Sequence, residues 1–370
     1  MILFLVPIIF YHYFPDYLIL TYMMSLFLLI VLNKFINTEL QIENKVLSTI
    51  LFIFLFTITS FTLFDYETNP FQISQGGHLY QYVSAITFFL FIIYFSFIAK
   101  IEEDKMKSFF KVFFYISLFS ILIEVILVNV INLSPNLIPT HRDSIIYNTR
   151  FEIFSYLRPF GLTGSAPVNG VIMTMLMWIN YINYKSIKYI YFSIVPIILT
   201  ASGTAYICLL VSLIYYLFSV RQINKLNILL SSSFVIIIFI YLYQAGFQKV
   251  NPDYVISFID LLRIEENIFS LNFTHILFGG LGNYPEIFSN DYIITEWYII
   301  YSISRFGLIA VSILWLYLFI NIYFTKYRII FIITFIGSLH VGTILYMPTI
   351  LILMVLIESL SKQNLSIKIK

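Results

Sequence analysis

Long apolar runs, separated by short polar breaks, constrain this chain more than any other feature of its sequence. A membrane-spanning helix needs about 20 apolar residues, and about 17 are tolerated. The apolar runs therefore predict that the chain is all-α, a polytopic integral membrane helix bundle of about twelve transmembrane helices in a single domain. One run, residues 293–325, is too long for a single straight crossing, so we expect residues 293–304 to form an interfacial or partly inserted helix that leads into a span from about Gly307. The candidate spans are residues 2–14, 17–33, 46–64, 79–99, 108–132, 167–184, 189–202, 204–220, 226–245, 293–325, 329–345 and 347–361.

Charged residues are scarce in the chain. They make up 11% of its 370 residues, against about 25% in a typical soluble domain. This excludes soluble enzymes, and a net charge of +2 gives no reason to expect a nucleic-acid partner. A lone Cys208 excludes a disulfide framework. Because the sequence has neither a nucleotide-binding glycine loop nor His, Cys and carboxylate residues at zinc spacing, we expect no cofactor and no metal.

The basic residues predict how the bundle is oriented. If the N-terminus is cytoplasmic, the inner loops hold 15 of the 21 basic residues, mostly Lys, and the outer loops hold six. Cytoplasmic loops are enriched in Lys and Arg, so both termini are predicted to be cytoplasmic. The outer basic residues are Lys249 and five arginines, Arg142, Arg150, Arg158, Arg263 and Arg305.

Two of the outer loops, residues 133–167 and 246–292, are long. Loops above about 12–15 residues without structure of their own are uncommon unless they are functional. Arginine is suited to paired hydrogen bonds with phosphate oxygens. We therefore expect the five outer arginines to bind an anionic group.

Arg158 begins a stretch rich in proline and glycine that ends at Pro167. Such a stretch cannot form a continuous helix, so we expect a fixed turn followed by a helix from near Pro167. The free N–H groups at the start of that helix would favour an anion beside Arg158. Arg158 is predicted either to bind this anion or to cap carbonyl groups at the turn.

The second outer loop supplies candidates for a catalytic base: His275, Glu286, Asp291 and Glu296. Two structural alternatives remain, a Glu296–Arg305 ion pair and an exposed His275. Inside the predicted spans, Glu124, His12 and His340 either pair with neighbouring polar groups or have a functional role.

Three segments carry a resemblance to a known family, the bacterial O-antigen and capsular repeat-unit polymerases, relatives of the O-antigen ligases. Residues 158–169 resemble an Arg-x-x-Gly…Pro-Asn segment at the outer end of a span. Residues 200–205 resemble a Thr-x-Ser-Arg-Thr-Ala turn, with Gly203 where an Arg is usual. Residues 280–283, 290–292 and 305–307 resemble the end of the family's large outer loop, with Ser289 where a His is usual.

The resemblance implies a membrane glycosyltransferase that joins undecaprenyl-diphosphate-linked repeat units on the outer face of the bacterial cytoplasmic membrane. It implies a polyprenyl-linked oligosaccharide substrate, with a chain-length regulator and a flippase as further partners. A donor that is already activated needs no nucleotide. The arginines would bind the diphosphate, and Asp291, His275 or Glu296 would act with Arg158 in catalysis.

Two other functions compete with this one, and so does a structural role as a scaffold for a glycan assembly complex, which would leave the outer arginines unexplained. An O-antigen ligase of the same superfamily shares the chemistry, but the missing histidine disfavours it. A flippase or other transporter of lipid-linked oligosaccharide would place charges near the middle of its spans, where this chain has few, chiefly Glu124.

Overall fold

The computed structural model describes residues 103–134, 152–153, 156–159, 161–163, 166–219, 276–277, 298–340 and 357. Within these ranges the chain is helical apart from two short antiparallel strands, β1 (Glu152–Ile153) and β2 (Tyr156–Leu157). The all-α fold class is therefore confirmed for the described part. The predicted spans at 2–14, 17–33, 46–64, 79–99 and 226–245, both termini and almost all of 347–361 lie outside it.

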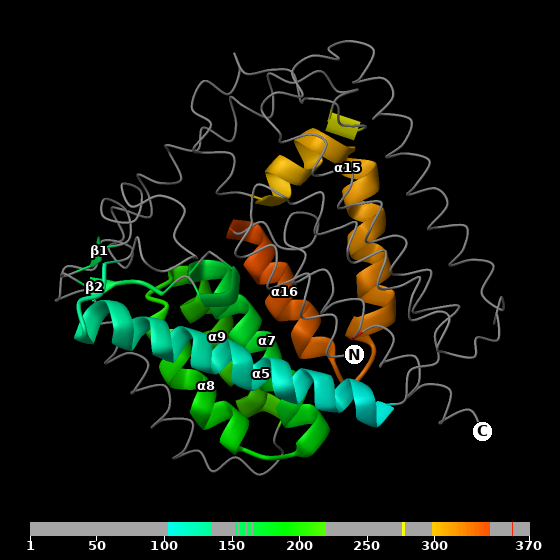
Figure 1. Cartoon of the computed structure of the whole chain (residues 1–370). Coiled ribbons are helices and arrows are strands. Elements are labelled where there is room, and N and C mark those ends of the chain that lie inside the picture. Colours follow the sequence, from blue (N-terminus) through cyan, green and yellow to red (C-terminus); the bar gives the residue numbers. More distant parts are fainter. Residues whose placement is uncertain are drawn as a thin grey trace, which may run out of the picture.

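The described helices fall close to predicted spans (Figure 1). The starts of α7 and α9 each lie one residue before their predicted positions, whereas α8 ends three residues before its predicted end and α5 begins five residues before its predicted span. Gly307, with φ 82° and ψ 153°, interrupts α15 where a break was expected. The helices are α5 (Glu103–Val125) with its π-helical continuation η5 (Ile126–Val130), α7 (Ala166–Tyr184), α8 (Lys188–Leu199), α9 (Gly203–Ser219), α15 (Tyr298–Leu318) with its π-helical continuation η10 (Phe319–Tyr323), and α16 (Arg328–His340).

Helix α7 is the centre of this part of the protein. It packs against α5, α8, α9 and α16, and 15 of its 19 residues are buried. It approaches α9 closely at Gly170, where an added Cβ would lie 2.2 Å from the Cβ of Ala205. Small residues at such a crossing let two helix backbones come close together.

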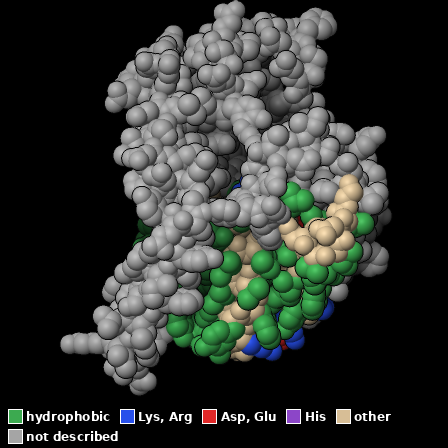
Figure 2. All heavy atoms as spheres, turned by 90° about the vertical axis from the view of Figure 1, so that its left-hand side faces the viewer, with side chains coloured by type: hydrophobic (Ala, Val, Ile, Leu, Met, Phe, Trp, Pro, Cys, Tyr) green, Lys and Arg blue, Asp and Glu red, His purple; other side chains and the backbone are tan. Residues whose placement is uncertain are grey.

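The exterior of the described helices is apolar. Large side chains on α5, α8 and α9 are exposed, among them Phe119, Ile123, Tyr191, Phe192 and Ile207. Figure 2 shows hydrophobic side chains over much of the described face, with basic side chains at its lower edge. One described helix, Glu103–Val130, is long and apolar enough to cross a membrane. This arrangement fits lipid contact, since exposed apolar patches of this kind are rare on soluble monomers.

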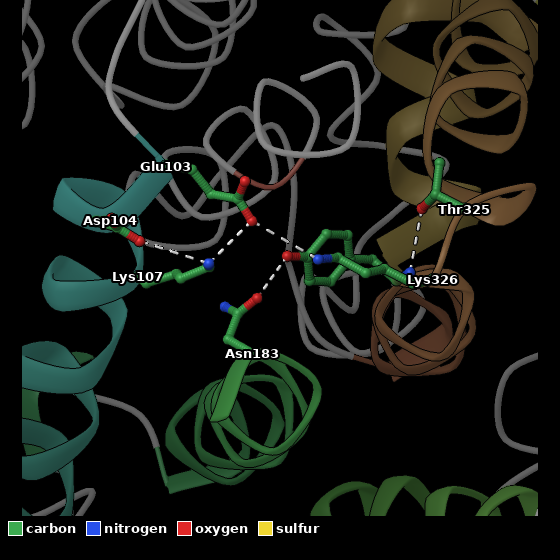
Figure 3. A network of polar contacts seen from close by, with 7 residues as sticks. Glu103, Asp104, Lys107, Asn183, Thr325 and Lys326 are labelled. Carbon is green, nitrogen blue, oxygen red and sulfur yellow. Dashed lines mark hydrogen bonds and ion pairs between the residues drawn. The ribbon is translucent and has the colours of Figure 1, made fainter. Parts of the chain in front are cut away.

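Polar side chains join α5, α7 and the loop before α16 at the start of α5 (Figure 3). Glu103 forms ion pairs with Lys107 at 3.0 Å and with Lys326 at 3.9 Å. The hydroxyl of Tyr327 donates a hydrogen bond of 2.6 Å to the Asn183 side-chain oxygen. Segments far apart in the sequence are thus joined at one end of the bundle.

The pKa of the Lys326 amine depends on this network. Burial lowers its pKa, the Glu103 carboxylate raises it, and the positive charges of Lys107 and Lys185 lower it further. Because a nearby negative charge favours the charged amine, Glu103→Gln is expected to lower the pKa of Lys326 further. The rate of Lys326 acylation, followed by peptide mass spectrometry, should then rise at lower pH than in the wild type.

Asp104→Asn is the matched control for this measurement. Asp104 pairs with Lys107 at 3.6 Å but is not among the groups that shift the pKa of Lys326. Its removal should leave the acylation profile nearly unchanged. An unchanged profile in Glu103→Gln would contradict the network.

Candidate functional site

A cluster of buried polar side chains lies at the opposite end of α5, where the Arg158 segment meets the turn between α8 and α9. Buried polar and charged groups are costly unless they form hydrogen bonds, so such a cluster needs either a structural or a functional reason. Its members come from α5, α7, α9 and the two connecting segments. They are Glu124, Arg158, Asn169, Thr200, Ser202 and Thr204.

Arg158 lies at the centre of this cluster and is only 3% exposed. Its Nη1 donates a hydrogen bond of 3.2 Å to the carbonyl oxygen of Ala201, 43 residues further along the chain. Arg158 thus caps a carbonyl, but at the turn between α8 and α9 rather than at the turn that was predicted to follow it in the sequence. This bond uses one of the five N–H donors of a guanidinium.

The turn that receives Arg158 is short and closely bonded. Ala201 has φ 45°, a left-handed conformation that only a few per cent of non-glycine residues adopt. The Thr200 hydroxyl donates to the Ile197 carbonyl at 2.7 Å, and the Tyr206 hydroxyl donates to the Ile198 carbonyl at 2.8 Å. These side-chain bonds add to the backbone bonds that the Thr200 and Ala201 N–H groups donate to the same two carbonyls. The turn is thus a fixed platform for the Arg158 guanidinium.

A second fixed point lies three residues after Arg158, at Gly161. Its backbone N–H donates a hydrogen bond of 2.7 Å to Glu124 Oε2 on α5. Gly161 has φ 54°, and an added Cβ would lie 2.6–2.9 Å from the side-chain amide of Asn169. Both the conformation and the close contact with Asn169 therefore favour glycine at this position.

A third fixed point lies one residue before Arg158, at Leu157. Asn129 in η5 donates to the Leu157 carbonyl at 2.9 Å and accepts the Leu157 N–H at 2.7 Å. This side chain bonds both backbone groups of one residue, as a neighbouring strand would do. Sequence reasoning did not single out Asn129, since a polar residue near the end of an apolar helix carries no local signal.

Several predicted site residues can be placed only in part or not at all. The backbone of Arg305 lies in α15, two residues before the break at Gly307, and His340 is the last residue of α16. Within the described ranges no three His, Cys, Asp or Glu residues lie together in a way that could hold a metal ion. Outside the described residues lie Arg142, Arg150, Arg263, His275, Glu286, Asp291, Glu296 and His12.

Chemically, the cluster joins a buried cation to a turn that packs on the N-terminal half of α7. The turn that Arg158 contacts packs on α7, because a Cβ added at Gly170 would lie 3.2 Å from the Thr200 hydroxyl. Helix starts carry N–H groups without partners in their own helix and favour negative charge. A guanidinium such as that of Arg158 has the chemistry to bind an anionic group such as a phosphate.

The two segments that meet here, residues 158–169 and 200–205, are two of the three that carry the resemblance described above. The chain itself matches no protein-family model, no curated protein and no solved structure.

Proposed function

We propose that this chain is a multi-pass protein of the bacterial cytoplasmic membrane that polymerises oligosaccharide repeat units into O-antigen or capsular polysaccharide. The observation that supports this best is the hydrogen bond from Arg158 to Ala201. It brings together two segments that are separate in the sequence and that resemble, independently, motifs of the same family.

The proposed reaction uses two lipid-linked oligosaccharides on the outer face of the membrane. A hydroxyl oxygen of the acceptor attacks the anomeric carbon of the donor's reducing-end sugar. The bond from this carbon to the diphosphate oxygen breaks, and undecaprenyl diphosphate leaves with the bonding electrons. A base takes the hydroxyl proton, for which Asp291, His275 and Glu296 are the candidates.

Arg158 has the chemistry that this step needs. Negative charge develops on the diphosphate as it leaves, and a fixed cation stabilises that charge in the transition state more than in the ground state. Arg142, Arg150, Arg263 and Arg305 are proposed to contribute further contacts to the diphosphate or the glycan. The fixed platform at Thr200–Ser202 supports this role, because preorganised donors need little rearrangement during the reaction.

Deleting the gene in the bacterium that encodes it tests the proposed function. We expect surface polysaccharide to collapse from a ladder of chain lengths to single repeat units, as seen on a gel. A plasmid copy should restore the ladder, which is the control for effects on neighbouring genes.

Two other results would contradict the proposal. Long chains that accumulate on the lipid carrier would indicate a ligase instead. Repeat units that remain on the cytoplasmic leaflet would indicate a flippase.

A further inference from the structure

We propose that Glu124 and Asn129, both at the C-terminal end of the α5–η5 helix, are positioning residues for Arg158. They hold the segment 157–161 from both sides, so that the guanidinium between them is directed at the α8–α9 turn. The inference rests on the proposed function only for what Arg158 does, since the clamp itself is a matter of geometry.

The hydrogen bonds define this clamp. Asn129 binds both backbone groups of Leu157, immediately before Arg158. Glu124 binds the N–H of Gly161, three residues after it. Because the backbone is fixed on both sides of Arg158, only the side-chain torsions of this residue remain to be set, and the bond to Ala201 restricts these.

The π-helical form of η5 helps one helix supply both contacts. On a regular α-helix, residues five apart are separated by roughly 140° and do not face the same neighbour. In η5 the Ile131 N–H donates to the Ile126 carbonyl, a bond across five residues, which brings residues at that spacing closer to one face. Glu124 and Asn129 are five residues apart, and the π-helix covers most of the interval between them.

The chemical character of Glu124 fits a positioning role. Its carboxylate is buried to 6% exposure near the end of a long apolar helix, where an ionisable group is expensive unless it has a purpose. An N–H group donated to a carboxylate forms a stronger bond than one donated to a neutral oxygen. Holding the Gly161 backbone is such a purpose, and it does not require Glu124 to contact the substrate.

Kinetics with a synthetic lipid-linked repeat unit, on purified protein in detergent or vesicles, separate positioning from simple structural support. Displacing a catalytic group by about 1 Å can cost on the order of 100-fold in rate. We therefore expect Asn129→Ala and Glu124→Ala to lower kcat by about 10- to 100-fold with much less change in KM. Glu124→Gln keeps an oxygen that accepts the Gly161 N–H and should recover most of the activity.

Matched controls come from the same structural contexts. Asn321 lies in the other π-helix, η10, where its side chain donates to the Tyr317 carbonyl at 2.8 Å. Ser120 lies on α5 and donates to the Ser117 carbonyl at 2.9 Å. Neither of these bonds reaches the Arg158 segment, so Asn321→Ala and Ser120→Ala should leave kcat close to the wild-type value. If Glu124→Gln is as inactive as Glu124→Ala, Glu124 acts through its charge and the clamp is wrong.

A labelling experiment tests the clamp without relying on activity. The chain has one cysteine, Cys208, so Cys208→Ala provides a cysteine-free background. Leu162→Cys then reports on the segment next to Gly161. Loss of either clamp residue should raise the rate of maleimide labelling at position 162 by about tenfold, since lost hydrogen bonds let the segment open more often.

The two assays separate the two hypotheses. Faster labelling in both alanine variants, together with a wild-type protein that polymerises nothing, would support the clamp and contradict the proposed function. Unchanged labelling in both alanine variants would overturn the clamp, whatever the activity.

Discussion

Arg158→Ala is expected to abolish polymer formation and to reduce the rate of glycosyl transfer by at least about 100-fold, the size of effect seen when a preorganised donor to a developing negative charge is removed. Arg158→Lys keeps the charge but not the planar pair of donors. It should therefore retain short chains at a much lower rate. The measurement is a gel of surface polysaccharide beside a quantitative blot of the protein in the membrane.

The control for this pair is Arg328→Ala. Arg328 begins α16, next to the Lys326 network and away from the polar cluster. We expect Arg328→Ala to leave the ladder of chain lengths unchanged. A wild-type distribution of chain lengths in Arg158→Ala, at normal protein level, would show that Arg158 does not act in the reaction.

Gly170→Ala is expected to destabilise the protein strongly. An added Cβ would lie 2.2 Å from the Cβ of Ala205 on α9, far inside the contact distance of two carbon atoms. Overpacking of a well-packed site costs about 1–3 kcal/mol and can exceed this, and here the obstacle is a methyl group attached directly to the neighbouring backbone. The melting temperature in detergent should fall by several degrees, with loss of protein from the membrane.

A compensating change gives this prediction its sharpest test. In Gly170→Ala combined with Ala205→Gly, one methyl group replaces another at the same crossing, so stability should return most of the way to the wild type. Gly203→Ala is the control, because a Cβ there has no neighbour within 4 Å. A double variant no more stable than Gly170→Ala alone would show that α7 and α9 do not cross at these residues.

Local signals predicted several ends of the described helices. Proline and glycine after Arg158 predicted a turn and then a helix near Pro167, and α7 begins at Ala166. The predicted spans 189–202 and 204–220 correctly divided one long apolar run into α8 and α9, although α8 ends three residues earlier than predicted. The expected break near Gly307 is present as a positive φ. In each case the residues that disfavour a continuous helix lie at the position where the helix begins or is interrupted.

The polar contacts around Arg158 could not be predicted in the same way. Asn129 bonds a residue 28 positions away, and Glu124 bonds one 37 positions away. Neither spacing leaves a periodic pattern, because the partner is set by how α5 packs and by the change to π-helical geometry. In the sequence, Glu124 stands out only as an ionisable residue inside an apolar run. Asn129 carries no local signal, although it makes two of the bonds that hold the segment.

The bond between Arg158 and Ala201 also has a consequence for biogenesis. A ribosome adds about 5–20 residues per second, so the 43 residues from Arg158 to Ala201 take about 2–9 s to synthesise at that rate. During that interval the carbonyl acceptor of Arg158 does not yet exist. The turn between α8 and α9 must be synthesised before this contact can form, so the cluster assembles only after α5 and α7 have been made.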